Sequence, residues 1–156
     1  MLPHLPAGRV VILRSRYHEN ITGALLNGAL AELKEQGISE SRIDVVELPG
    51  AFELPAAAAK IAKQLSVDAV IALGAVVRGE TPHFDFICQA CAQGLSRVAE
   101  QTGKPVTFGV ITANTVEQAF ERAGGRVGNK GQEAARAALE LFSSLKRWEQ
   151  QQASGS

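Results

Sequence analysis

The segment that decides the fold is VDAVIALGAVV, residues 67–77, which is followed directly by RGETPH, residues 78–83. The first part is almost wholly apolar, and this predicts a strand that is buried on both faces of a sheet. The second part brings an arginine, a glycine, a carboxylate, a hydroxyl and a histidine together in one short connection. A simple connection between a strand and a helix does not need so many reactive side chains, so this strand end is a candidate functional site.

Further strands and helices alternate on both sides of this segment. The sequence predicts strands at 9–16, 43–50 and 105–112, and helices at 20–37, 52–65, 82–103, 115–124 and 131–148. Asn20 is the expected cap of the first helix, and Thr81 with Pro82 the expected start of the third. Buried strands separated by helices predict an α/β protein, a three-layer αβα sandwich around a parallel sheet. We expect a single domain over 1–156, with residues 1–8 and 149–156 flexible.

The composition is that of an ordinary globular protein, with 46% hydrophobic and 21% charged residues. Lys plus Arg equals Asp plus Glu at 16 each, so bulk charge does not favour nucleic acid or an anionic membrane as a partner. The first residues do not have the pattern of a secretory signal, and the apolar runs are too short to span a bilayer. We therefore expect a cytoplasmic protein with no nucleic-acid or membrane partner.

The two cysteines, Cys88 and Cys91, form a C-x-x-C pattern inside a predicted helix. Two cysteines are too few for a disulfide framework, and the sequence has no second pair to complete a zinc site. We interpret both as ordinary helix residues and expect no metal.

Ligands bind beyond the carboxyl ends of the strands in such sheets, so the groups that follow each predicted strand are candidates. Tyr17 follows the first strand and offers an aromatic face, while Phe52 and Glu53 follow the second. A plain loop explains Tyr17 equally well at this stage. A carboxylate at a helix start is also favoured by the helix dipole alone, so Glu53 has a structural explanation as well.

The connection after the third strand predicts an anion site, because a glycine-containing turn leads into a helix N-terminus with outward N–H groups. Arg78 either adds to this site or pairs with a carboxylate. His83 falls in the first helical turn, where the positive end of the dipole favours the neutral imidazole and makes it available as a base. The alternative is a capped helix with an incidental exposed histidine.

Two later segments carry weaker signals. Phe108 lies inside the fourth predicted strand, where an aromatic residue is more often part of the core. Arg122, Arg126 and Lys130 lie in and beside the glycine-rich segment ERAGGRVGNKGQE, which lacks the spacing of a Walker loop. Glycines let cations approach a ligand closely, but a solvated turn explains the same segment.

Five motifs in register make the sequence resemble a known family: PGAFELP, LGAVVRGETPHFD, FGVIT, EQAFERAG and GNKG. Together they are similar to the lumazine synthases, over about residues 9–145. The resemblance implies a flavodoxin-like four-stranded parallel sheet and a homopentamer, which in this family sometimes assembles into decamers or sixty-subunit shells. It also implies the condensation of 5-amino-6-(ribitylamino)uracil with 3,4-dihydroxy-2-butanone 4-phosphate, the penultimate step of riboflavin biosynthesis, without a cofactor or metal.

The resemblance implies roles for individual residues. His83 matches the family's proton-transfer residue, and Tyr17 the aromatic residue that stacks on the pyrimidine. The remaining implied substrate-binding positions are Ala51, Phe52, Glu53, Val76, Val77, Gly79, Glu80, Thr81, Phe108, Arg122 and Lys130. Of these, residues 51–53 hold the ribityl chain and pyrimidine, residues 76–77 line the ring pocket through backbone groups, and residues 79–81 form the phosphate loop.

Three of these residues are implied to come from the neighbouring subunit. Phe108 covers the ring, Arg122 binds the phosphate, and Lys130 positions it with Glu133 nearby. The resemblance therefore predicts an active site shared between two copies of the chain, so that a lone chain is inactive.

The chain departs from the family pattern at a few positions. Tyr17 and His18 stand where Phe-Asn is common, and Glu80 places a carboxylate beside the phosphate loop, where we expect its side chain to point away. Prolines near the N-terminus weaken the strand pairing with a neighbour that this segment makes in the family. Two other hypotheses stay open: a catalytically silent homologue that binds flavin or lumazine or builds a shell, and a generic flavodoxin-like mononucleotide binder.

Overall fold

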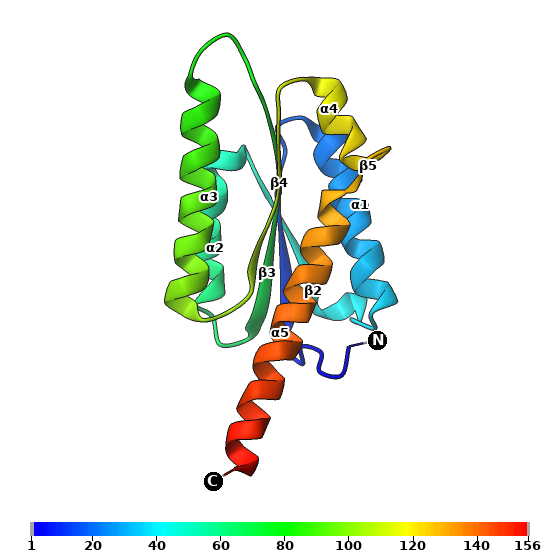
Figure 1. Cartoon of the computed structure of the whole chain (residues 1–156), viewed down its shortest axis with the longest axis vertical. Coiled ribbons are helices and arrows are strands. Elements are labelled where there is room, and N and C mark those ends of the chain that lie inside the picture. The colour runs from blue at the N-terminus through cyan, green and yellow to red at the C-terminus, as the bar shows by residue number, and fades with distance from the viewer. Residues whose placement is uncertain (1, 156) are drawn as a thin grey trace.

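A computed structural model describes residues 2–155 and shows one four-stranded sheet between two layers of helices (Figure 1). The strands are β1 (Arg9–Ser15), β2 (Ile43–Leu48), β3 (Val67–Val77) and β4 (Val106–Ala113). Every pairing is parallel, in the order β2-β1-β3-β4. This confirms the predicted αβα sandwich with a four-stranded parallel sheet in the flavodoxin-like arrangement.

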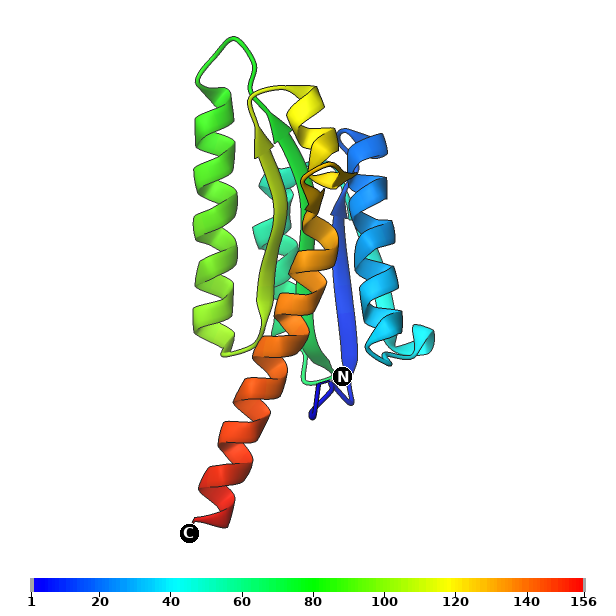
Figure 2. The same cartoon turned by 45° about the vertical axis from the view of Figure 1, so that its right-hand side comes forward.

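The helices divide between the two faces of the sheet. Their bounds are α1 (Glu19–Glu35), α2 (Leu54–Ala62), α3 (His83–Thr102), α4 (Val116–Glu121) and α5 (Lys130–Ser154). Helices α1 and α5 pack together on one face, and α2 and α3 pack together on the other, as Figures 1 and 2 show. Successive strand residues point to opposite faces, so Ile12 joins the α1–α5 core while Leu13 joins the α2–α3 core.

Two predicted helix starts were wrong by one or two residues. Helix α1 is capped by His18, not Asn20, because His18 adopts left-handed backbone angles (φ 62°, ψ 58°) and turns the chain from strand to helix earlier. The His18 carbonyl accepts hydrogen bonds of 3.0 Å from the N–H groups of Ile21 and Thr22. Helix α3 is capped by Pro82, not by the predicted Thr81, which lies one residue before the cap.

The segment before α5 also differs from the prediction. Residues 123–129 form an antiparallel hairpin, β5 (Ala123–Gly125) and β6 (Gly128–Asn129), where the sequence predicted the end of a helix and a loop. Gly124 (φ 104°) and Gly128 (φ 116°) supply the positive φ angles that close the hairpin.

The C-terminal helix is longer than predicted. Helix α5 continues past the predicted end at Trp148 as far as Ser154, and its last part projects beyond the sheet (Figure 1). Near the other end of the chain, Leu2 and Leu5 pack against the core. The flexibility expected for residues 1–8 and 149–156 stays a prediction, and residues 1 and 156 lie outside the described part.

Close packing between α1 and α5 anchors the hairpin to α1. A side chain at Gly131 would overlap the backbone of Leu25, so only glycine lets α5 start this close to α1. Asn129 accepts hydrogen bonds from the first turn of α5 and donates one of 3.1 Å to the carbonyl of Ala24 on α1. The position of the hairpin relative to the sheet is therefore set by α1.

Within residues 2–155, no helix is long and apolar enough to cross a membrane.

Candidate active site

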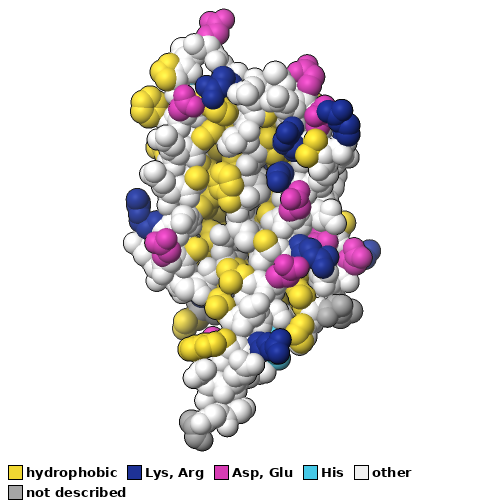
Figure 3. Space-filling model, in the orientation of Figure 1, with side chains coloured by type: hydrophobic (Ala, Val, Ile, Leu, Met, Phe, Trp, Pro, Cys, Tyr) yellow, Lys and Arg dark blue, Asp and Glu magenta, His cyan; other side chains and the backbone are white. Residues whose placement is uncertain are grey.

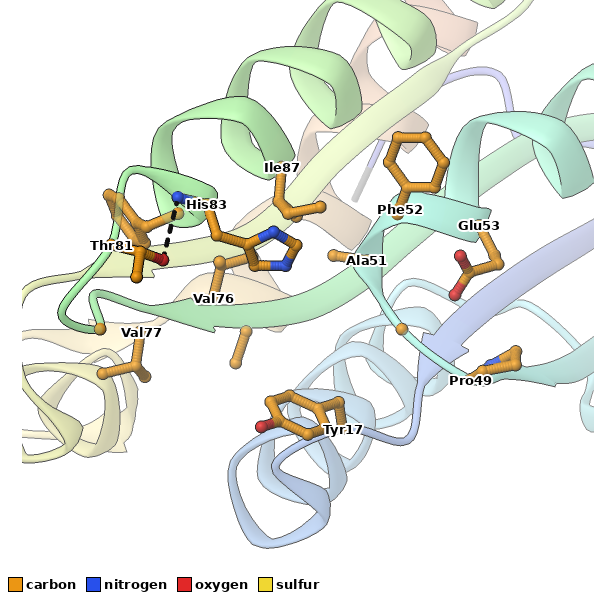
Figure 4. A pocket seen from close by; sticks show the side chains of 14 residues that line it. Tyr17, Pro49, Ala51, Phe52, Glu53, Val76, Val77, Thr81, His83 and Ile87 are labelled. Atoms are coloured by element: carbon orange, nitrogen blue, oxygen red, sulfur yellow. Dashed lines mark hydrogen bonds between the residues drawn. The ribbon is translucent and has the colours of Figure 1, made fainter.

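A pocket of about 470 Å³ opens at the carboxyl ends of β1 and β3 (Figure 4). The chain leaves β1 toward β2 on one side and crosses back to β3 on the other, so the strand order reverses there. Ligands in open α/β sheets bind at this kind of reversal. The pocket is lined by Tyr17, Pro49, Gly50, Ala51, Phe52, Glu53, Ala75, Val76, Val77, Gly79, Thr81, His83, Phe84 and Ile87.

Two aromatic side chains at the pocket are open to solvent rather than packed in the core. Tyr17 is 68% exposed and Phe52 is 58% exposed. Tyr17 follows the end of β1, and its ring meets the His18 ring edge-on, with 4.6 Å between the ring centroids. Large apolar rings left uncovered at a cavity favour a ligand that stacks on them.

One short turn after β2 presents both an aromatic ring and a carboxylate. Residues Ala51–Glu53 form a single 3₁₀ turn that leads into α2, and the Glu53 N–H donates to the Gly50 carbonyl at 3.3 Å. In Figure 4, the Phe52 and Glu53 side chains point in different directions from this turn. The carboxylate is an acceptor for hydroxyl or amine groups of a ligand.

His83 is the first residue of α3 and reaches into the pocket. Its backbone N–H donates to the Thr81 hydroxyl at 3.4 Å, and its imidazole lies beside Ile87 and points toward Ala51 and Val76 (Figure 4). The side chain is exposed, so a bound ligand can exchange a proton with it.

The charged residues of the same connection, Arg78 and Glu80, do not line the pocket. Arg78 pairs with Asp85 at 3.5 Å and donates to the Asn114 side-chain oxygen at 2.9 Å. Pairing with a carboxylate is one of the two outcomes that the sequence left open for this arginine. Glu80 is exposed and does not line the pocket. None of the described residues that line the pocket is a lysine or an arginine.

Phe108, Arg122 and Lys130 lie elsewhere on the chain. Phe108 is on the edge strand β4 and is 42% exposed, while the two cations flank the hairpin. The Lys130 N–H donates to the Arg122 carbonyl at 2.9 Å, so the hairpin brings these two residues together. Figure 3 shows hydrophobic side chains along the middle of this face, with Lys and Arg side chains beside them around α4 and β5.

Arg122 and Lys130 both have partners within the chain. The Arg122 guanidinium donates to the Gln118 carbonyl at 3.0 Å and lies 3.9 Å from the Glu121 carboxylate. The Lys130 ammonium lies 3.4 Å from the Glu133 carboxylate, as expected for Glu133. These contacts are solvent-exposed or half-buried, so an incoming anion can compete for either cation.

The sequence analysis missed five lining residues: Pro49, Gly50, Ala75, Phe84 and Ile87. Periodicity could have found three of them. Ala75 lies two positions before Val77 and therefore shares its strand face. Phe84 and Ile87 are three positions apart and share one helix face, which follows from helical spacing after His83.

No group of three or more His, Cys, Asp or Glu side chains within residues 2–155 is arranged to hold a metal ion. The two cysteines lie on α3 outside the pocket lining, and burial raises the pKa of both thiols. The pKa of Cys91 is raised to about 12 by burial and by the neighbouring Cys88. Neither thiol is poised as a nucleophile.

The four-stranded parallel sheet and the pocket at its strand reversal define the class of the protein as a flavodoxin-like α/β fold. The family described as 6,7-dimethyl-8-ribityllumazine synthase matches residues 7–146. The chain belongs to this family, and membership implies a role in riboflavin biosynthesis.

Proposed function

We propose that the protein condenses 5-amino-6-(D-ribitylamino)uracil with 3,4-dihydroxy-2-butanone 4-phosphate to form 6,7-dimethyl-8-ribityllumazine, releasing phosphate and water. The observation that carries the proposal is the composition of the pocket. It combines exposed aromatic rings, the Glu53 carboxylate and the His83 imidazole at the strand reversal, in a chain of the matching family. No cofactor or metal is needed for this reaction, because the amine substrate is itself the nucleophile.

The pyrimidine substrate is proposed to occupy the aromatic side of the pocket. The Tyr17 ring stacks on the pyrimidine, and backbone groups of Val76 and Val77 bind its edge. Phe52 and Glu53 hold the ribityl chain, since a carboxylate accepts hydrogen bonds from the chain's hydroxyl groups. The exposure of Tyr17 and Phe52 supports this arrangement, because both rings have a face left free.

The phosphate of the second substrate is proposed to lie on the turn that begins α3. Gly79 and Thr81 line the pocket there, and N–H groups at a helix N-terminus bind anions. Glu80 would contribute its backbone only, which fits its position outside the pocket lining. The phosphate then lies close to His83, on the side of the pocket opposite to Tyr17.

The reaction begins when the substrate amine attacks the ketone carbon and water leaves to form an imine. His83 then removes a proton from the carbon skeleton, and the electron pair expels the phosphate. Arg122 stabilises the charge that collects on the leaving phosphate. The enol that results takes up a proton at its terminal carbon and loses its hydroxyl proton, which makes a new ketone. Attack of the second nitrogen on this ketone closes the ring and releases water, a step that depends mainly on holding the reactants together.

The complete site is proposed to form between copies of the chain in a homopentamer. A phosphate dianion needs a cation, and none of the described lining residues of the pocket carries one. Arg122 and Lys130 stand together on a hairpin anchored to α1, and Phe108 lies exposed on the edge strand β4. A head-to-tail contact that brings this region to the next subunit's pocket generates a ring when its rotation closes, and a pentamer is such a ring.

The deciding experiment mixes both substrates with the purified protein and follows the fluorescence of the lumazine product. We expect formation well above the spontaneous rate, with each substrate alone and a buffer mixture as controls. No acceleration would leave the silent-homologue hypothesis standing. Native mass measurement on the same sample separates a pentamer from a decamer or a larger shell.

A further inference from the structure

Arg78 makes three separate contacts at the end of β3. Its Nε donates to the Asn114 side-chain oxygen at 2.9 Å, and its Nη2 lies 3.5 Å from an Asp85 carboxylate oxygen. Its guanidinium carbon also lies 4.4 Å from the centre of the Phe84 ring, at cation–π distance. Phe84 is buried and lines the pocket, whereas Asp85 is exposed.

These contacts join both ends of the turn that carries the proposed phosphate loop. Arg78 itself precedes the turn at residues 79–82, while Phe84 and Asp85 follow it in the first turn of α3. His83 lies directly before these two contact residues. One side chain therefore connects the start of the turn with the helix that begins at His83.

The contact with Asn114 attaches the turn to the segment that follows β4 at the edge of the sheet. Asn114 follows β4, and its N–H donates to the Gln118 side chain at 2.9 Å. The Gln118 N–H in turn donates to the Thr115 hydroxyl at 3.1 Å, which caps α4. The Arg78 N–H also donates to the Ala113 carbonyl at 2.9 Å. Asn114 is therefore a fixed anchor for the guanidinium.

We propose that Arg78 is a positioning residue that holds the turn at residues 79–82, and with it His83, against the end of β4. The proposal rests on the proposed function for its catalytic consequence only. The planar guanidinium of arginine can donate hydrogen bonds in two directions and stack on an aromatic ring at the same time, whereas the ammonium of lysine cannot. The ion pair with Asp85 is half-exposed, so its loss should cost little stability and leave the fold intact.

The first test is hydrogen exchange on the protein without substrate. The amides of Asp85 and Phe86 donate to the Pro82 carbonyl at 3.0 and 3.4 Å, and they report on the first turn of α3. In Arg78→Met we expect their exchange to become about tenfold faster, since local opening loses its restraint. Arg97→Met removes a cation from the exposed side of the same helix and is the matched control. Exchange equal to that of the control would overturn the proposal.

The second test separates positioning from a general structural loss. Arg78→Met should raise KM for the phosphate substrate and lower kcat, each by about tenfold, and leave KM for the pyrimidine within twofold. Asn114→Ala should show part of the same effect, and the double variant should be no worse than Arg78→Met alone, because the two residues act as one unit. A fall in kcat with both KM values unchanged, or fully additive effects, would contradict the proposal.

Direct phosphate binding by Arg78 is distinguished by the same pair of tests. In that case KM for the phosphate substrate rises while exchange in the substrate-free protein stays at the control rate, and this result would overturn the positioning role. Arg78→Lys should recover no more than part of the activity, because it keeps only the pairing with Asp85. An inactive wild-type protein would refute the proposed function, whereas the exchange experiment would still decide the role of Arg78.

Discussion

Two regions of the molecule expose complementary chemical groups. The pocket at the ends of β1 and β3 is concave and combines aromatic rings with Glu53 and His83. The region formed by β4 and the hairpin instead exposes Phe108 beside Arg122 and Lys130. The first region has aromatic stacking and a base without a lining cation, and the second has cations without a pocket around them. The site that we propose between neighbouring copies requires this division.

The anchoring of the hairpin explains why the two regions stay apart within one chain. Asn129 is hydrogen-bonded to Ala24 of α1, and Gly131 allows α5 to contact α1 directly. The hairpin cannot leave α1 without breaking these contacts, so Arg122 and Lys130 are held away from the chain's own pocket. In the proposed pentamer, a second copy would supply the cations for this pocket.

The largest effect should come from removing the proposed phosphate cation. Arg122→Ala is expected to lower kcat/KM for the phosphate substrate by about 10²–10³, because a charge-assisted contact to the leaving group is lost. Arg126→Ala is the matched control, since Arg126 is 80% exposed and pairs with Glu121. Steady-state kinetics with the phosphate substrate varied provide the measurement. Unchanged saturation behaviour would remove the hairpin from the site.

A smaller loss is expected from the pocket side. His83→Ala should lower kcat by about 10², the low end of the range for general acid–base catalysis, because substrate proximity is preserved. His4→Ala is a control for a histidine outside the pocket. A pH–rate profile identical to that of the wild type would argue against His83 as the base.

Mixing the His83→Ala and Arg122→Ala variants tests whether the site is divided between two chains. If His83→Ala and Arg122→Ala chains are dissociated, combined in equal amounts and reassembled, about a quarter of the junctions should join an intact pocket to an intact arginine. Activity should recover to about a quarter of the wild-type rate. Mixing the variants without dissociation is the control. An activity no greater than the sum of the separate variants would mean that each chain completes its own site.

The smallest effect concerns the two cysteines of α3. Their labelling rate shows whether a substitution in the hairpin region alters the region around the pocket. The thiolate is the reactive form and both pKa values are raised, so labelling should be slow at pH 8 and become faster as the pH rises. Cys91, with a pKa of about 12, should stay unlabelled while the half-buried Cys88 reacts. Mass spectrometry after timed labelling provides the measurement. Arg122→Ala should leave the Cys88 rate unchanged, and a different rate would show that the two regions are coupled within the chain.

Much of the pocket could be predicted from sequence because its residues directly follow predicted strands. Tyr17, Phe52 and His83 come within a few positions of the ends of β1, β2 and β3, and the carboxyl ends of parallel strands meet at one edge of a sheet. Local periodicity is therefore enough to place them in one pocket. The left-handed His18 that sets the start of α1 was not predictable in the same way, because Asn20 two positions later is the better cap by residue type.

By itself, the sequence determined the layers of the fold, the strands and the set of side chains beyond them, because hydrophobic periodicity is a local property. Only the tertiary structure decided where Arg78 points and where the hairpin lies. By residue type alone, the Arg78 guanidinium could donate to several acceptors. It donates to Asn114, which is distant in sequence and is brought close by the pairing of β3 with β4. The position of Arg122 and Lys130 depends on the contact between α1 and α5, and packing between segments this far apart leaves no periodic signal in the chain.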